Sequence, residues 1–405
     1  MTAPEKINQR SKLLIGILTV LVAGGPVSTD LYLPSLPSIG ADFAAPTSAT
    51  QLTLSVFIAG FALGTLVFGP LSDRFGRRPM MLAGMAVFTA GSIGCAGAGS
   101  IETLIAWRLV EAFGGGAGPV LARAVVRDLF AREDAARTLS YMGAAMAVAP
   151  ALAPMIGGAI HLGFGWRGQF WALAAAGGGL LILVWASVAE TNRHPDRDAA
   201  RPARILRNVF ALVSNRAFIG FAATSGFSYG GLFGFISGGA FVVIGVLGVA
   251  PESFGFLFVF VAGGFVAGST VGGALAKRWG VVRMIEAGVW TGVAAAGIGL
   301  GLALAGIVSP LSVIAPVAAV FFGCALVFPS ATAGAIGPFP HMAGTASSVA
   351  GFVQMSIGAA VGAVVGATLD GTTRPLFAVI LASSLVALAL FYAVVRPADA
   401  RRTPA

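Results

Sequence analysis

Long apolar stretches alternate with short polar segments along the whole chain. Segments 300–308 and 376–395 carry apolar side chains toward every face of a helix, whereas a strand of a membrane barrel would alternate apolar and polar positions. A helix needs about 20 mainly apolar residues to cross a hydrocarbon core of roughly 30 Å. The pattern therefore predicts membrane-spanning helices and disfavours a β-barrel.

Twelve such stretches fit into the 405 residues, with short connections between most of them. We expect spans at 13–35, 49–70, 79–98, 101–125, 137–160, 168–189, 216–238, 252–275, 282–305, 311–334, 344–368 and 375–396. The chain is thus predicted to be an all-α integral membrane protein with twelve transmembrane helices.

Basic residues gather in alternate connections. If the N-terminus is cytoplasmic, the cytoplasmic segments carry Arg74, Arg77, Arg78, Arg127, Arg132, Arg137, the arginines of 193–216, Lys277, Arg278, Arg283, Arg401 and Arg402. The other side keeps little beyond Arg167 and Arg374. The positive-inside rule then predicts that both termini are cytoplasmic. These loops account for the net charge of +9, so we expect no nucleic-acid partner.

The chain divides into two halves. One long polar stretch, 190–215, separates an N-terminal six-helix bundle, 1–189, from a C-terminal one, 216–405. Segment 69–76 (GPLSDRFG) recurs as 273–280 (GALAKRWG), each time after the second span of its half. Two bundles related by a pseudo-two-fold axis along the membrane normal are a recurrent design of secondary transporters, with the substrate bound between them.

Composition excludes several other functions. The chain is 57% hydrophobic and only 10% charged, far from the quarter or so of charged residues in soluble domains. No phosphate-binding loop or His-Glu-x-x-His pair occurs, and Cys95 and Cys324 lie in separate apolar stretches as expected core residues. We expect no enzyme, ATP-driven pump, cofactor or metal site. A channel or sensor remains an alternative to a transporter.

The connection between spans two and three reads GPLSDRFGRR. Its glycine turn, single acid and three arginines resemble the signature loop of the major facilitator superfamily. The resemblance implies a conformational motif formed by Gly69, Asp73, Arg74, Gly76, Arg77 and Arg78. We expect Asp73 to cap a neighbouring helix N-terminus, such as that of span eleven, in one conformation only. The alternative is that the arginines only anchor to anionic lipid headgroups.

Span five combines glycine with helix-kinking proline. The residues that form this pattern are Gly143, Pro150, Pro154, Gly157 and Gly158. They resemble the motif of the antiporter branches of the superfamily, which favours an exporter over an importer. Packing alone is the alternative explanation for any single glycine.

Three segments narrow the resemblance: DLYLPSLP at 30–37, WRLVEAFG at 107–114 and RAVVRDLF at 123–130, which contains Arg127 and Asp128. Together they are similar to the bicyclomycin and chloramphenicol (florfenicol) resistance branch of drug:proton antiporters, although that branch usually has Gln in place of Glu111. The resemblance implies a monomeric exporter of amphenicol- or bicyclomycin-like compounds, coupled to protons by alternating access. The alternative is export of a metabolite such as an amino acid or sugar.

Charged residues inside a span cost roughly 2.5 to 3.5 kcal/mol each, so they are usually functional. Asp30 and Arg108 have similar predicted depths, which allows an ion pair or a shared water cavity. Glu111 lies one turn from Arg108 and either neutralises it or takes part in coupling. We expect Asp30 to carry the proton, because it is the only acid inside span one and a lone buried carboxylate can be neutralised by a proton when its cation partner moves away. Glu111 is the alternative carrier.

Aromatic side chains at mid-depth can line an apolar cavity for an organic substrate. With the three buried charges Asp30, Arg108 and Glu111, the predicted substrate-binding residues are Tyr32, Phe57, Phe61, Tyr229, Phe235 and Gln354. A position in the core or against lipid is the alternative for each ring. Near the inner end of span nine, we expect Glu286 to form an ion pair with Arg283.

Overall fold

The computed structural model describes residues 3–130, 132–192, 202–339 and 342–400. Within these ranges all regular secondary structure is helical. Eleven helical segments of the described chain are long and apolar enough to cross a membrane. The predicted helical membrane fold is confirmed, with the spans close to the expected positions.

The first half contains seven α-helices and one short 3₁₀ helix. They are α1 (Ala3–Asp30), η1 (Leu33–Ser35), α2 (Leu36–Asp42), α3 (Thr47–Phe75), α4 (Arg77–Ala96), α5 (Ile101–Gly115), α6 (Ala117–Leu129) and α7 (Arg132–Ser187). The helix α7 covers the predicted spans five and six, which fold back at Gly165, a residue with φ 66°. A positive φ of this kind favours glycine because it has no Cβ.

The segment expected to be a linker contains a helix of its own, α8 (Pro202–Val213). The second half then runs through α9 (Arg216–Ala240), η2 (Phe241–Val246), α10 (Pro251–Leu304), α11 (Pro310–Ile336), α12 (Ala343–Thr368), α13 (Arg374–Leu390), η4 (Phe391–Val395) and α14 (Arg396–Ala400). Like α7, α10 joins two predicted spans, and it turns at Gly280 with φ 72°.

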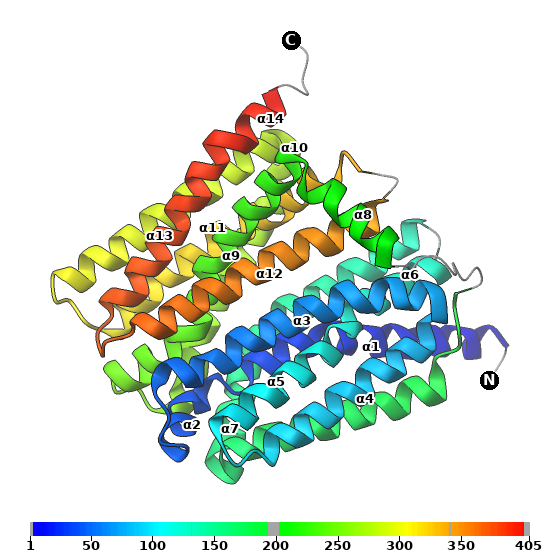
Figure 1. Cartoon of the computed structure of the whole chain (residues 1–405), viewed down its shortest axis with the longest axis horizontal. Helices are drawn as coiled ribbons and strands as arrows, with labels where there is room; N and C mark the ends of the chain where they lie inside the picture. The colour runs from blue at the N-terminus through cyan, green and yellow to red at the C-terminus, as the bar shows by residue number, and fades with distance from the viewer. Residues whose placement is uncertain (1–2, 131, 193–201, 340–341, 401–405) are drawn as a thin grey trace.

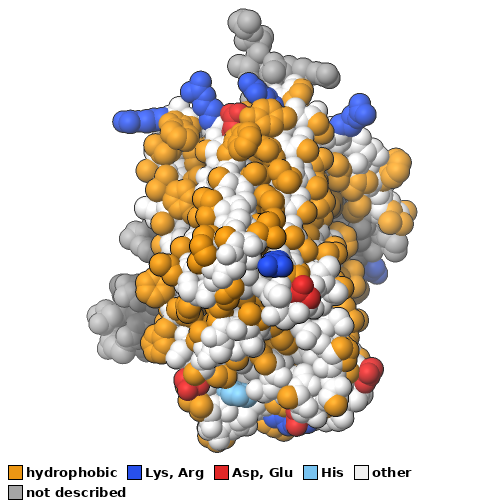
Figure 2. All heavy atoms as spheres, turned by 90° about the vertical axis from the view of Figure 1, so that its left-hand side faces the viewer, with side chains coloured by type: hydrophobic (Ala, Val, Ile, Leu, Met, Phe, Trp, Pro, Cys, Tyr) orange, Lys and Arg blue, Asp and Glu red, His pale blue; other side chains and the backbone are white. Residues whose placement is uncertain are grey.

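Figure 1 shows the two halves as separate groups of helices lying side by side. Packing between them is concentrated in two pairs, α3 with α12 and α7 with α10. The termini and α8 lie toward one end, which we call the linker end, and α2 lies toward the other, the far end. Figure 2 views the molecule from the left of Figure 1 and shows a mainly hydrophobic surface with few charged side chains.

Glycines bring the two halves into close contact. Gln51 of α3 packs against Gly366 of α12 and Gly238 of α9, and the Cα of Glu252 in α10 lies 3.3 Å from where a Cβ on Gly158 of α7 would be. Small residues at these positions allow the helix backbones to approach closely. Such packing matters in a membrane, because lipid provides no hydrophobic driving force for helices to associate.

Candidate functional site

Two of the buried charged residues of the first half, Arg108 and Glu111, lie on one face of α5. This helix starts with a capping box, in which the Ser100 hydroxyl accepts from the Thr103 amide and the Ser100 amide donates to the Thr103 hydroxyl. Arg108 Nη1 donates to Glu111 Oε2 over 2.7 Å, and neither side chain is exposed. The three-residue spacing predicted that these side chains would be neighbours, and the structure confirms it.

Three further side chains donate to the Glu111 carboxylate. Ser28 Oγ of α1 and Ser92 Oγ of α4 donate to Oε1 over 2.8 and 3.1 Å, and the Cys95 thiol of α4 donates to Oε2 over 3.6 Å. With Arg108, these donors come from three helices and offset the cost of removing the carboxylate from water. Cys95 is buried, as expected, and also belongs to this network.

Three aromatic rings surround the Arg108 guanidinium. Its Cζ lies 4.1 Å from the ring centre of Phe57, 4.3 Å from that of Tyr32 and 5.6 Å from that of Phe170. Ring faces attract a cation more strongly when water is excluded. The Tyr32 hydroxyl lies 2.9 Å from Thr53 Oγ1, which fixes the ring. Phe170 was not among the predicted site residues, because nothing in the pattern of span six distinguishes it.

Asp30 is the last residue of α1 and is 3% exposed. Within the described part of the chain, its carboxylate forms no ion pair and no side-chain hydrogen bond. It lies near enough to the Tyr229 phenol of α9 to act on it electrostatically. Of the two arrangements that the sequence allowed, the ion pair of Asp30 with Arg108 is not formed here, because Ser28 faces Arg108 and residues two apart on a helix do not share a face.

The other predicted substrate-binding residues do not gather around Arg108. Phe61 stacks on Phe57 with ring centres 6.2 Å apart, and Tyr229 stacks on Phe233 at 6.0 Å. Phe235 is 1% exposed and packs between Phe258 and Phe321 in the second half, the arrangement of a core residue. Gln354 of α12 accepts a hydrogen bond from Ser225 of α9 over 3.2 Å.

The loop at 69–78 forms a charged network at the linker end. Arg77 is its centre, donating to Ser72 Oγ over 2.7 Å, to Asp128 over 3.0 Å and to Asp73. Among the described residues Asp73 has no contact with the start of α12 in this conformation; its carboxylate pairs instead with Arg77, four residues on. The remaining motif residues include an exposed Arg74 over the Phe75 ring, at 4.8 Å.

Two arginines of the predicted motif differ in their surroundings. Arg78 Nη2 donates to the Trp185 carbonyl over 2.7 Å and so joins the start of α4 to the end of α7. Arg127 is exposed in the last turn of α6.

The motif glycine Gly69 faces Val120 of α6. A Cβ on Gly69 would lie 3.4 Å from Cγ1 of Val120.

Glu190 caps the N-terminus of α4, a role that sequence reasoning missed. Its carboxylate accepts from four backbone amides at 2.8 to 3.1 Å, those of Arg77, Arg78, Thr191 and Asn192. Burial opposes ionisation, but these amides prevail and hold the pKa of Glu190 below its ordinary value. Gly76, with φ 104°, precedes α4 and leaves the space that this carboxylate fills.

The glycine and proline motif lies in the first part of α7. Gly157 packs on the Leu31 carbonyl, directly after Asp30, and its own carbonyl accepts from Gln169 Nε2 over 2.7 Å. Pro154 and Gly158 are buried, and Gly158 adjoins the start of α10. The side-chain surroundings of Gly143 and Pro150 lie outside what the structure describes.

The predicted ion pair between Glu286 and Arg283 is wrong. Glu286 instead accepts a hydrogen bond from the Tyr392 hydroxyl over 2.7 Å, and Trp290 Nε1 donates to the same hydroxyl over 3.2 Å. The aromatic hydroxyl on the neighbouring helix takes the place of the basic partner.

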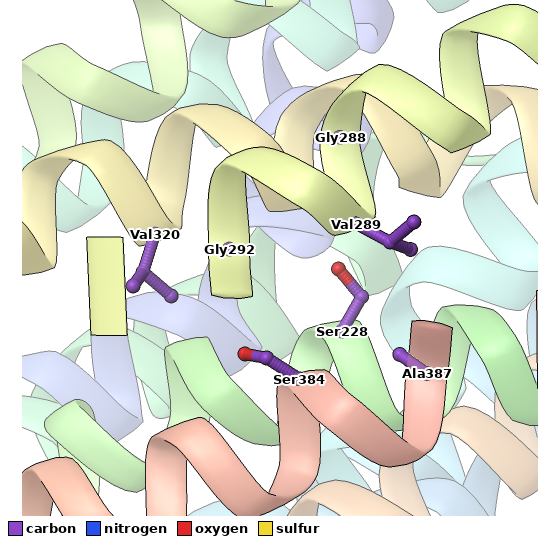
Figure 3. Close-up of a pocket in the computed structure, with 7 residues that line it drawn as sticks. All are labelled: Ser228, Gly288, Val289, Gly292, Val320, Ser384 and Ala387. Carbon is purple, nitrogen blue, oxygen red and sulfur yellow. The ribbon is translucent and has the colours of Figure 1, made fainter. Parts of the chain in front are cut away.

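A small pocket lies inside the second half, between α9, α10, α11 and α13. Figure 3 shows the two serine hydroxyls that face it; its lining is Ser228, Gly288, Val289, Gly292, Val320, Ser384 and Ala387. None of these was a predicted site residue. Among the described residues there is no group of three or more metal-ligating His, Cys, Asp or Glu side chains.

Known proteins resemble this chain over most of its length. A Bacillus subtilis (strain 168) protein, the uncharacterized MFS-type transporter YdgK, is 32% identical over 384 residues, 94% of each chain. The bicyclomycin resistance protein homolog of Haemophilus influenzae is 30% identical over 401 residues, 95% of this chain and 97% of that one. Multidrug resistance protein D of Escherichia coli (strain K12) is 29% identical and covers 85% of this chain and 86% of its own.

Solved structures share the fold. A bacterial homolog of the human lysosomal transporter Spinster matches with a TM-score of 0.72 at 15% identity, covering 98% of both chains. The xylose transporter XylE from E. coli matches with a TM-score of 0.69 at 13% identity, covering 94% of this chain and 96% of its own. Residues 17–363 match the family described as Major Facilitator Superfamily. The chain belongs to the major facilitator superfamily.

Proposed function

We propose that the protein is a proton-coupled exporter of small organic compounds, drugs of the bicyclomycin or chloramphenicol type, that works by alternating access between its two halves. The names of two relatives, a bicyclomycin resistance protein homolog and a multidrug resistance protein, favour drugs over an amino acid or sugar. The orientation follows from the basic loops: both termini and α8 face the cytoplasm of a bacterial cell, and the protein is a monomer surrounded by lipid.

One observation carries the coupling mechanism. Arg108 and Glu111 form an ion pair inside the first half, whereas Asp30 is buried without a cation. A buried carboxylate without a counter-ion is stable when a proton neutralises it. Asp30 would therefore bind a proton when the halves close on it and release the proton when movement of the halves admits water.

Asp30→Asn tests this assignment. In proteoliposomes, wild-type protein should accumulate radiolabelled chloramphenicol or bicyclomycin when a pH gradient is imposed. The variant should lose that response and keep exchange of labelled for unlabelled drug, because the amide cannot change its charge. Proton-driven accumulation by Asp30→Asn would refute the role of Asp30. The same assay on Glu111→Gln shows whether the alternative acid carries the proton.

A further inference from the structure

Ser28 joins the last turn of α1 to both members of the buried ion pair. Its Oγ donates to Glu111 Oε1 over 2.8 Å and accepts from Arg108 Nη1 over 3.3 Å. Its backbone carbonyl accepts from Nη1 and Nη2 of Arg108, each over 3.4 Å. Carbonyls in the last turn of a helix lack an intrahelical donor, and Arg108 supplies the donor for the Ser28 carbonyl. Ser28 is fully buried.

Asp30 follows Ser28 by two residues and lies on another side of the same helix end. The end of α1 therefore holds the buried Arg108–Glu111 pair on one side, and η1, which follows it directly, contacts α9 and α10 of the second half. A shift of Asp30 relative to α5 must stretch or break the hydrogen bonds of Ser28. The titratable or charged groups around this helix end are Arg108 and Glu111 on α5, Cys95 on α4, Tyr32 after α1 and Tyr229 on α9.

We propose that Ser28 is a positioning residue, which links the Arg108–Glu111 pair to Asp30 and thereby sets the pH at which Asp30 exchanges its proton. The inference rests on the proposed role of Asp30 as proton carrier. An ionised Asp30 gains from any movement that brings it donors or water, and Ser28 resists that movement. The hydrogen bonds of Ser28 thus favour the protonated form of Asp30 over the ionised form.

Labelling with dicyclohexylcarbodiimide measures this effect without a transported compound. The reagent adds the protonated carboxyl across one of its C=N bonds, so the fraction of labelled Asp30, identified by peptide mass spectrometry, follows its protonation. In proteoliposomes, Ser28→Ala should lower the midpoint of the labelling curve by about one pH unit. This is a tenfold decrease in proton affinity, the size expected for one hydrogen bond to a charged group. Ser28→Thr keeps the hydroxyl and should restore the wild-type midpoint.

Ser92→Ala is the matched control. Ser92 is also fully buried and donates to the same Glu111 oxygen, over 3.1 Å, but it belongs to α4 and has no connection to Asp30 along the chain. Its midpoint should equal that of the wild type. Equal displacements in Ser28→Ala and Ser92→Ala would overturn the inference, since the charge environment of Glu111 would then suffice.

The two proposals fail in different ways. An unchanged midpoint in Ser28→Ala, with Asp30 labelled in a pH-dependent manner in the wild type, would refute the role of Ser28 and leave the proposed function intact. Absence of pH-dependent labelling of Asp30 in the wild type would refute both. Thermal unfolding of each purified variant in detergent shows whether it is folded.

Discussion

Arg108 is stabilised by two kinds of contact at a position that is fully buried in the protein. One carboxylate neutralises its charge, and the faces of three rings occupy the space around the guanidinium. The planar, delocalised guanidinium fits this arrangement better than an ammonium, because it can stack on rings and donate in fixed directions at once. Removal of either charge alone would leave the other buried without a partner, which costs several kcal/mol.

Arg108→Ala should abolish drug transport, because Glu111 then loses its cation and the rings around it collapse. Arg108→Lys should retain only part of the activity, since a lysine cannot donate to Ser28 and Glu111 in the same geometry. Uptake into inverted membrane vesicles, normalised to the amount of inserted protein, is the measurement. Arg167→Ala is the control: its pair with Asp42 is about half exposed, so transport should be unaffected. Normal resistance in cells with Arg108→Ala would contradict the prediction.

Sequence reasoning at this scale succeeded where spacing along one helix was enough. The pairing of Arg108 with Glu111 follows from a separation of three residues. The surroundings of Asp30 could not be predicted, because they depend on the rotation of α1 about its axis relative to α5 and α9. Glu190 was missed for a similar reason, since its partners at the start of α4 are more than 100 residues away.

Gly157 allows α7 to lie close against the chain directly after α1. A Cβ on Gly157 would overlap the Leu31 carbonyl, and a backbone atom cannot rotate away as a side chain can. The contact lies directly after Asp30, so the glycine and proline motif of span five supports the helix end that carries the proposed proton site.

Gly157→Ala should therefore lower the melting temperature and slow transport. Overpacking of this kind costs about 3 kcal/mol when backbone must move. Gly163→Ala is the control on the same helix, because nothing lies within 4 Å of its Cβ position. Thermal unfolding in detergent measures both variants. If Gly157→Ala melts at the same temperature as the wild type, α7 can move away from the chain after α1 without loss of stability.

The start of α4 depends on the ionised carboxylate of Glu190. A carboxylate at a helix N-terminus contributes about 1 kcal/mol. Because the pKa of Glu190 is lowered in the folded state, its contribution is complete above the unfolded value of about 4.3 and is lost as the pH falls through the folded pKa.

Glu190→Gln should accordingly lower the melting temperature at pH 7 and have less effect at the lowest pH that the protein tolerates. Thermal unfolding across a pH series provides the measurement. A difference between variant and wild type that stays constant with pH would show that the charge of Glu190 is not responsible.

Elements were easier to predict than their ends. The predicted span 49–70 lies inside α3, which continues to Phe75, because apolar residues mark only the part of a helix that needs lipid. The same limit applies to α7 and α10, where helix continues on both sides of Gly165 and Gly280. Hydrophobicity alone gives no sign of helix outside the membrane.

The two halves contact each other through α3 with α12 and α7 with α10, yet Asp73 binds Arg77 within its own half. We expect Asp73 to reach the start of α12 only in another conformation of the transport cycle, in which the two halves are arranged differently. Asp73→Asn should then reduce turnover about tenfold, the effect of one hydrogen bond to a charged group, and leave drug affinity unchanged.

Transport rate and drug binding, measured separately, distinguish these effects for Asp73→Asn. Accessibility of single cysteines to reagents from each side of the membrane should also change. Asp370→Asn is the control, because Asp370 is an exposed carboxylate whose partner is Thr372 in the same loop. Equal losses of affinity and rate in Asp73→Asn would argue for a different role of Asp73.

Mutual neutralisation of Arg108 and Glu111 has an electrical consequence. With those charges cancelled, Asp30 is the buried carboxylate of the described chain that lacks a cation. If one proton on Asp30 enters for each uncharged drug that leaves, every cycle moves one positive charge inward. The membrane voltage then adds about 2.3 kcal/mol per 100 mV to the driving force. A drug with one positive charge would carry that charge back out, so its export would be electroneutral and driven by the pH gradient alone.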